Sequence, residues 1–257
     1  MTRTEPLSRT GAPASDARRA ALVTGGSGGI GRAVALRLAA DGVAVGVHYA
    51  GNRSAAEAVV DEIVSDGGRA IAVAGDVADD QAMSAAFDRV EEAFGGVDVV
   101  VNTAGVMVLG PIASYDLDAF DRIVRTNLRG AFVVSQQAAR RVRAGGAIVN
   151  FSTSVTRTHF PSYGPYVATK AAVEGMTLIL ARELRGKDIT VNAVAPGPTA
   201  TPLFLQGKDE AAVAQLAAAA PLERLGAPED IAEVVAFLAG PARWVNGQVL
   251  FANGGLA

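Results

Sequence analysis

The sequence predicts a doubly wound α/β fold, in which one parallel sheet of about seven strands carries helices on both faces. Short apolar runs alternate along almost the whole chain with longer stretches in which apolar residues recur every three or four positions. A glycine-rich turn joins the first apolar run to the first of these stretches. Parallel strands need crossover connections, so this alternation favours a single sheet with helices as the crossovers.

The strands are predicted from the short apolar runs. The first, residues 20–24, reads AALVT and is followed by glycines, which is typical of a buried parallel strand. The others are expected at residues 43–49, 69–75, 97–101, 147–151, 189–193 and 248–251.

Helices are expected between these strands. In the first helix Ile30, Ala33, Val34 and Leu38 share one face, and Gly42 ends it. The remaining helices are expected over residues 54–66, around 83–94, around 120–128, over 166–184 and, as one or two helices, after the proline-rich loop that follows the sixth strand.

Length and composition indicate a single domain. The chain has 257 residues, half of them hydrophobic, which suffices for one well-buried core. We expect residues 20–257 to form this domain, and the polar, proline-bearing residues 1–19 to form a disordered tail and not a signal peptide. No apolar run approaches the roughly 20 residues that span a bilayer, so no membrane partner is expected.

Charge and residue types exclude several classes of function. The net charge of −3, with both signs interleaved, argues against a nucleic-acid partner. The absence of cysteine excludes disulfides, thiolate chemistry and cysteine-ligated metals, and fits a cytoplasmic location. The two histidines, His48 and His159, stand far apart in the chain, so no metal site is expected.

The turn after the first strand reads TGGSGGIG from Thr24 to Gly31. Glycine allows a tight turn and a close approach of the backbone to a pyrophosphate. The helix that follows presents free N–H groups and the positive end of its dipole to that anion. A lone glycine cluster is more often a flexible turn, but here it follows the first strand and opens a helix, as a dinucleotide site requires.

Tyr166 and Lys170 stand four residues apart, on one face of a predicted helix. Tyrosine has a reference pKa of about 10, and a nearby cation stabilises the phenolate and lowers that pKa, which suits the phenol to acid–base catalysis. In isolation such a pair is more often a surface contact worth a few tenths of a kcal/mol. In the context of the glycine turn the catalytic interpretation is favoured.

With these motifs in this order, the sequence resembles the short-chain dehydrogenase/reductase family. The family's TGxxxGIG signature is matched by Thr24, Gly25, Gly29, Ile30 and Gly31. Further matches are Asp76–Val77, Asn102–Thr103–Ala104–Gly105, Asn127, Tyr166 with Lys170, and Pro196–Gly197. Thr103 replaces an asparagine that supports the sheet backbone in the family, which puts local stability there in doubt. The sequence looks closest to branches of the family that include 3-oxoacyl carrier-protein reductases and naphthol reductases. The resemblance implies a Rossmann-type fold and hydride transfer between a nicotinamide cofactor and a carbonyl or alcohol.

The resemblance implies four catalytic positions. Tyr166 donates a proton to the carbonyl or removes one from the alcohol, and Lys170 holds the ribose hydroxyls of the cofactor. Asn127 matches an asparagine that holds a water relay to the lysine, although a buried amide that satisfies helix backbone has the same signature. The family's catalytic serine is replaced by Thr153, which keeps the hydroxyl. Ser154 supplies it instead if that loop is one residue shorter.

The cofactor is expected to be NADPH. The second strand ends at Tyr49 without the Asp or Glu that binds the ribose 2′-hydroxyl of NAD, and Asn52, Arg53 and Ser54 can donate to a 2′-phosphate. Gly28 argues the other way, because many NADPH-using relatives carry an arginine there. The other expected cofactor contacts are Gly25, Ser27, Gly29, Ile30, Gly31, Tyr49, Asp76 and Val77 (at the adenine), Asn102, Ala104, Gly105, Tyr166, Lys170, and Pro196, Gly197, Thr199 and Thr201 (around the nicotinamide).

Substrate identity is expected to lie in two segments, residues 155–165 and 203–221, of which the second forms a lid. Candidates for an apolar pocket are Phe160, Tyr163, Leu203, Phe204 and Leu205, although core packing or subunit contact explains them equally well.

The predicted function is therefore NADPH-dependent reduction of a small-molecule carbonyl, with a ketone or 3-oxoacyl substrate favoured. Alcohol oxidation by the same site is the first alternative. A non-catalytic dinucleotide sensor is the second, and the presence of both Tyr166 and Lys170 argues against it. Relatives are commonly tetramers that pair the helices near residues 115–142 and 163–184, so a homotetramer is expected.

Overall fold

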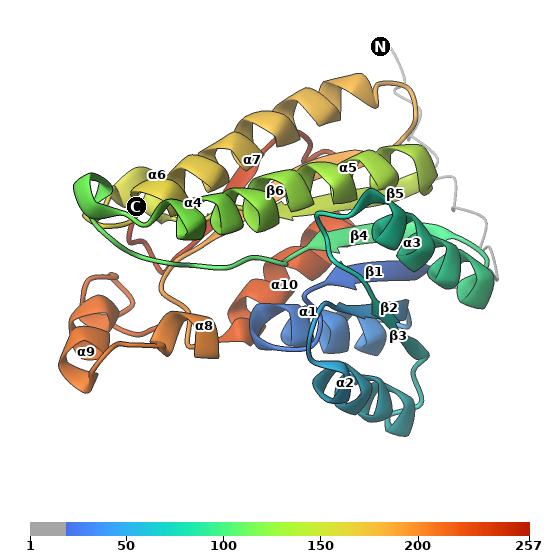
Figure 1. Cartoon of the computed structure of the whole chain (residues 1–257). Helices are drawn as coiled ribbons and strands as arrows, with labels where there is room; N and C mark the ends of the chain where they lie inside the picture. Colours follow the sequence, from blue (N-terminus) through green and yellow to red (C-terminus); the bar gives the residue numbers. More distant parts are fainter. Residues whose placement is uncertain (1–18) are drawn as a thin grey trace, which may run out of the picture.

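The computed structural model describes residues 19–257, so the tail predicted for residues 1–19 lies, except for Arg19, outside the described residues. The described chain forms one seven-stranded parallel sheet in the order β3-β2-β1-β4-β5-β6-β7 (Figure 1). Its strands are β1 (Ala20–Thr24), β2 (Ala44–Tyr49), β3 (Ala70–Ala74), β4 (Val97–Asn102), β5 (Val142–Phe151), β6 (Thr190–Pro196) and β7 (Val249–Ala252). The predicted fold class is confirmed.

Helices cover both faces of the sheet (Figure 1). One face carries α1 (Gly29–Ala40), α2 (Arg53–Ser65) and α10 (Pro228–Ala239), and the other carries α3 (Asp80–Phe94), α5 (Gly130–Arg141) and α7 (Gly164–Glu183). The shorter elements are a 3₁₀ turn (Ile112–Ser114), α4 (Leu117–Ile123), a π-helical segment (Val124–Arg129) that joins α4 to α5, α6 (Val155–Thr158), α8 (Pro202–Leu205) and α9 (Glu210–Ala218).

The two cores follow from the alternation of side chains along the strands. In β1, Ala21 and Val23 pack against the face that carries α1, while Ala20 and Leu22 pack against the face that carries α3. All four side chains are fully buried. A strand buried on both faces therefore appears in the sequence as a continuous apolar run.

Several boundaries differ from the predicted ones. The fifth strand begins at Val142, five residues before the predicted start, and its pairing with β4 is irregular between Val97 and Val99. The helix predicted around residues 120–128 runs from Leu117 to Arg141 through the π-helical segment. The short helix α6 was not predicted, because four residues are too few to show a helical period.

The strand order places the functional edge of the sheet. After β1 the chain adds β2 and β3 on one side, then crosses over to place β4 on the other side of β1. The glycine turn after β1 therefore lies at the topological switch point, where ligands bind in such folds. Helices α8 and α9 stand apart from the two helical layers, at the lower left of Figure 1. Among the described helices, none is long and apolar enough to cross a membrane.

His48 on β2 is a buried imidazole without a hydrogen-bond partner among the described residues. Its side chain is 1 % exposed and its Nε2 faces Gly75. Burial lowers the pKa of His48 from 6.5 to about 4. The unfolded chain therefore binds a proton as the pH falls through 6.5, whereas the folded chain does so only near pH 4, and stability is lost across this window.

We expect this difference to cost the wild type about 2 kcal/mol of unfolding free energy at pH 4.5 relative to pH 7. The variant His48→Leu keeps an apolar side chain in the site and should lack this part of the pH dependence. Urea unfolding of both proteins at the two pH values measures it. An equal loss of stability in wild type and variant would contradict the assignment to His48.

Candidate active site

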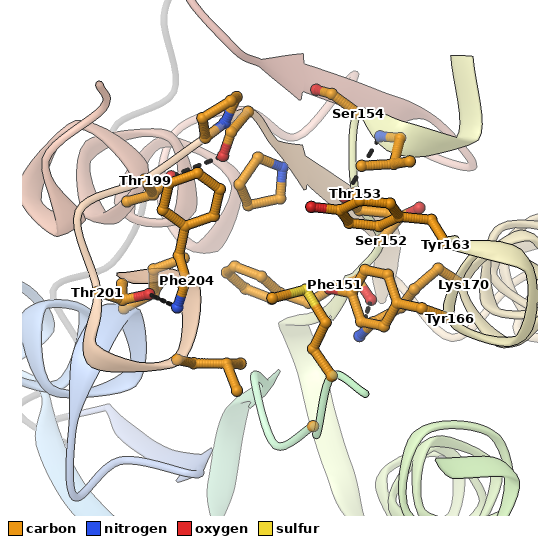
Figure 2. Close-up of a pocket in the computed structure, with 18 of the residues that line it drawn as sticks. Phe151, Ser152, Thr153, Ser154, Tyr163, Tyr166, Lys170, Thr199, Thr201 and Phe204 are labelled. Carbon is orange, nitrogen blue, oxygen red and sulfur yellow. Dashed lines mark hydrogen bonds between the residues drawn. The ribbon is translucent and has the colours of Figure 1, made fainter. Parts of the chain in front are cut away.

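The predicted catalytic residues Thr153, Tyr166 and Lys170 line one cavity of about 140 Å³ at the carboxyl edge of the sheet, together with part of the predicted cofactor residues. Asn127, the glycines of the turn and the residues of the predicted adenine end do not line it. Ile30 from the start of α1, Gly105 after β4, and the segment after β5 line it together with Tyr166 and Lys170 from α7 (Figure 2). The last residue of β6, Pro196, also lines it, and the segment that follows supplies Gly197, Thr199 and Thr201. Parallel strands end at the same edge, so motifs far apart in sequence become neighbours.

The glycine turn forms a cradle that side chains would fill. Gly25 and Gly29 have φ angles of +65° and +51°, which favour glycine. A Cβ at Gly31 would lie 2.2 Å from the carbonyl oxygen of Gly25, whereas a Cβ at Gly28 would meet nothing within 4 Å. Gly28 caps α1 without a side-chain hydrogen bond, so the first amides of the helix stay available to an anion. The turn thus fits a pyrophosphate.

Thr103 supports the sheet in place of the family's asparagine. Its hydroxyl donates to the carbonyl oxygen of Thr24 at the end of β1. The Thr24 hydroxyl in turn donates to Asn102 Oδ1 at 2.9 Å and accepts from the amide of Ala104 at 3.3 Å. The ends of β1 and β4 are therefore tied together through Thr24 and Thr103.

Lys170 is buried and held by backbone. Its Nζ donates to the carbonyl oxygen of Phe151 at 2.9 Å and lies 5.9 Å from the centroid of the Tyr166 ring. Burial lowers the pKa of Lys170 to about 8. The lysine therefore stays largely charged at neutral pH, in a position between the end of β5 and the tyrosine.

Asn127 lies in the π-helical segment, a helix type that occurs frequently at functional sites. Its side chain donates to the carbonyl oxygen of Val106 and accepts from the amide of Val106, both at 2.8 Å. It thus holds the segment after β4 and not its own helix. A Cβ at Gly105 would lie 3.3 Å from Asn127 Oδ1 and 3.6 Å from Lys170 Nζ, so the three positions are neighbours.

The pKa of the Tyr166 phenol lies above its ordinary value in the protein alone. Burial raises the pKa of Tyr166 to about 12, although a hydrogen bond with Thr153 lowers it. The lowering expected from Lys170 is wrong for the protein alone, because the ammonium binds the carbonyl oxygen of Phe151 and burial of the phenol dominates. A phenol that stays protonated at neutral pH suits a proton donor, the role needed in reduction.

The two hydroxyls after β5 have different partners. Ser154 donates to the carbonyl oxygen of Ala195 and accepts from Nδ2 of Asn253, each at 3.1 Å. Thr153 faces Tyr166, and among residues 19–257 its hydroxyl accepts only a long hydrogen bond, 3.3 Å, from the amide of Val155. The geometry therefore favours Thr153 over Ser154 as the hydroxyl that meets a substrate, and that role stays a prediction.

The predicted adenine end is preorganised by local hydrogen bonds. Asn52 caps α2 by accepting from the amide of Ala55 at 3.0 Å, and Asp79, not Asp76, caps α3. Asp76 accepts hydrogen bonds from the amide of Ala78 and from Arg125. These contacts hold the pKa of the Asp76 carboxyl below its usual range, and the Ala78 amide has the larger effect. The Val77 side chain is buried, so only its backbone is available to a ligand.

Arg53 is the candidate for the 2′-phosphate. It is exposed, and its Nε donates to Glu57 Oε1 at 2.7 Å. We expect Arg53→Ala to weaken NADPH binding about tenfold and to leave NADH binding unchanged, because one charge-assisted contact is lost. Fluorescence titration with both cofactors measures this effect. Arg89→Ala, which breaks a similar exposed ion pair on α3, is the matched control. Equal weakening of NADPH and NADH would contradict the assignment.

Apolar side chains line the substrate end of the cavity. Four predicted residues, Phe160, Tyr163, Leu203 and Phe204, are among them, whereas Leu205 is not and is 39 % exposed. Leu216, from the predicted segment 203–221, also lines the cavity, as do Met107 and Leu256, which the sequence did not indicate. Figure 2 shows Phe204 across the cavity from Tyr163 and Tyr166.

An aromatic row leads to the catalytic phenol. The ring centroids of Phe160 and Tyr163 are 6.1 Å apart, and those of Tyr163 and Tyr166 are 6.4 Å apart. These distances fall within the range of favourable aromatic pairs. A substrate that reaches Tyr166 therefore passes along apolar and aromatic surface.

Comparisons with known proteins agree with this geometry. The family model described as Enoyl-(Acyl carrier protein) reductase matches residues 25–257. A short-chain type dehydrogenase/reductase of Picea abies is 48 % identical over 248 residues, covering 92 % of each chain. The 3-oxoacyl-[acyl-carrier-protein] reductase FabG of Staphylococcus aureus is 42 % identical over 241 residues, covering 93 % of this chain and 98 % of its own.

A solved structure adds the fold and a cofactor. A short chain dehydrogenase from Burkholderia cenocepacia J2315 in complex with NADP is 42 % identical, covers 93 % of this chain and 98 % of its own, and superposes with a TM-score of 0.87. The predicted resemblance is confirmed at the level of the family. The chain belongs to the short-chain dehydrogenase/reductase family of NAD(P)H-dependent oxidoreductases.

Proposed function

We propose that the protein is an NADPH-dependent carbonyl reductase whose substrate is neutral and largely apolar around the carbonyl. The observation that carries this proposal is the lining of the cavity. Lys170 is the one charged side chain among the described residues that line it, and its ammonium is bound to the carbonyl oxygen of Phe151. A substrate carboxylate near the reacting carbon would therefore have no free cation to pair with.

The residues of the chain perform the proton part of the reaction. Bound NADPH supplies the hydride. Tyr166 donates its phenolic proton to the carbonyl oxygen, and the Thr153 hydroxyl donates a hydrogen bond to the same oxygen. Lys170 holds the ribose hydroxyls of the cofactor and stabilises the phenolate that remains. Asn127 keeps the segment after β4 in place beside Lys170.

The test is NADPH oxidation with a panel of carbonyl compounds. The panel holds neutral aryl and alicyclic ketones, aldehydes, a 3-oxoacyl thioester, and 2-oxo acids as charged members. We expect turnover of neutral members and none of the 2-oxo acids. Efficient reduction of 2-oxo acids would contradict the proposal. Tight NADPH binding without any turnover would favour the dinucleotide sensor, and preference for NADP⁺ with alcohols would favour the oxidative direction.

We also propose that the enzyme is a homotetramer. Exposed apolar side chains lie on α4, α5 and α7, the helices expected to pair: Leu117, Phe120, Phe132, Leu178 and Ile179. Burial of this surface by another copy would remove it from water. Light scattering on a sizing column tests the assembly, and a monomer at working concentration would contradict it.

We place the enzyme in the cytoplasm, where a chain without cysteine needs no disulfide, and fractionation of cells tests this placement.

A further inference from the structure

Glu174 connects the two parts of the active site. It lies on α7 one turn beyond Lys170, on the helix face that also carries Tyr166. Its Oε1 accepts a hydrogen bond from the Ser152 hydroxyl at 2.5 Å and one from the Thr156 hydroxyl at 2.9 Å. Ser152 and Thr156 stand on either side of Thr153. One carboxylate oxygen thus straps the segment that carries Thr153 to the helix that carries the catalytic phenol.

The opposite side of this segment is held by backbone hydrogen bonds and by the Ser154 hydroxyl, which donates to the carbonyl oxygen of Ala195 and accepts from Asn253. The amide of Ser152 donates to the carbonyl oxygen of Val194, and the amide of Ser154 donates to that of Pro196, both at 2.8 Å. These bonds fix the segment to β6, whereas its side toward α7 is held by the bond from Lys170 to the carbonyl oxygen of Phe151 at its start and by the carboxylate of Glu174 on both sides of Thr153. The Thr156 hydroxyl also lies 2.8 Å from the carbonyl oxygen of Thr153, so it shares its proton between that oxygen and the carboxylate.

The geometry does not give Glu174 a direct electrostatic role at the reacting groups. The pKa of Tyr166 is shifted by burial, by Thr153 and by Tyr163, and the pKa of Lys170 is lowered by burial. Glu174 is not a cause of either shift. An effect of Glu174 on catalysis would therefore pass through the placement of the segment after β5.

We propose that Glu174 is a positioning residue, whose carboxylate holds Ser152 and Thr156 so that the Thr153 hydroxyl points at Tyr166 and at the substrate carbonyl oxygen. The proposal rests on the carbonyl reduction proposed above. A hydroxyl that is already held in its productive orientation stabilises the transition state without reorganisation. A mobile hydroxyl therefore lowers kcat, whereas the affinity for the cofactor stays the same.

The first test compares Glu174→Leu with Glu174→Gln. We expect Glu174→Leu to lower kcat by about 10- to 100-fold while the Kd for NADPH stays within about twofold, because the cofactor side of the site is untouched. Glu174→Gln keeps an acceptor oxygen at the same place and should recover most of kcat. Glu183→Leu removes an exposed carboxylate from the last turn of the same helix and should behave as wild type. A loss of kcat in Glu174→Gln equal to that in Glu174→Leu would overturn the proposal.

A double-mutant cycle with Thr153→Ala identifies the residue through which Glu174 acts. If Glu174 positions Thr153, Glu174→Leu should change kcat less than about twofold once the Thr153 hydroxyl is gone. The same 10- to 100-fold loss in both backgrounds would show that Glu174 acts elsewhere.

Hydrogen exchange separates this proposal from the proposed reaction. Glu174→Leu should speed amide exchange in residues 152–158 and leave β1 and the glycine turn unchanged, whether or not a substrate has been found. Unchanged exchange in residues 152–158 would overturn the strap. If Glu174→Leu exchanges faster in this segment but the wild-type enzyme reduces no carbonyl, the proposed reaction is contradicted and the strap is kept.

Discussion

Replacing Tyr166 with phenylalanine is expected to lower kcat/KM for carbonyl reduction by about 10³-fold, with NADPH affinity within about twofold of wild type. The phenol is partly buried beside Thr153, and its removal from water raises its pKa to about 12, which favours the protonated form at neutral pH. Phenylalanine keeps the ring that packs against Tyr163 at 6.4 Å and removes only the proton donor. The loss should therefore fall on the chemical step.

Steady-state kinetics with the best ketone of the panel measure kcat/KM, and a fluorescence titration with NADPH measures the affinity for the cofactor. Tyr163→Phe is the matched control, because it removes the neighbouring phenol from the same aromatic row. Its kcat/KM should stay within about tenfold of wild type, since Tyr163 is not the assigned acid. If Tyr166→Phe keeps more than a tenth of wild-type activity, another group donates the proton.

Alanine at position 31 is expected to raise the Kd for NADPH at least about 100-fold and to destabilise the protein by about 1–3 kcal/mol. A Cβ there would lie 2.2 Å from the carbonyl oxygen and 2.8 Å from the carbonyl carbon of Gly25, and also 2.7 Å from Thr103 Oγ1. Two of these atoms are backbone of the turn itself, so the turn must open to admit the methyl group. An opened turn no longer aims the first amides of α1 at the pyrophosphate.

The control is alanine at position 28, in the same turn. Gly28 has extended backbone, with a φ of −169°, and a Cβ there would meet nothing within 4 Å. We expect Gly28→Ala to keep its melting temperature and most of its NADPH affinity. Thermal unfolding and a cofactor titration of both variants check the pair. Tight NADPH binding by Gly31→Ala would contradict the cradle described for this turn.

Much of the fold could be predicted because its causes are local. Residues 20–23 are apolar on both strand faces, the next helix shows apolar residues at helical spacing, and glycines separate the two. Boundaries were less predictable where no local period exists, as in the extension of β5 back to Val142. The gathering of the motifs at one edge could also be predicted, because the ends of parallel strands meet there.

The substrate side of the site could be predicted only in part. Phe160 and Tyr163 stand close to Tyr166 in sequence, and both line the cavity as expected. Met107 follows β4 and Leu256 is the second-last residue, and nothing in their local pattern links either to a pocket. They reach the cavity because the sheet brings the end of β4 and the segment after β7 to the same edge.

For the catalytic pair, the sequence determines where the two side chains lie, whereas the tertiary structure determines their protonation. The spacing of Tyr166 and Lys170 places them on one helix face, and this placement follows from the period of a helix whatever surrounds it. The state of the phenol depends on groups from other elements. These are the neighbours that remove it from water, the Thr153 hydroxyl, and the carbonyl oxygen of Phe151 at the end of β5, which accepts from the ammonium of Lys170. Solvent exclusion and contacts between distant residues arise only in the packed chain, so the spacing of residues in the sequence does not predict them. The strap from Glu174 to Ser152 and Thr156 is an example, because it forms only once α7 lies against β5.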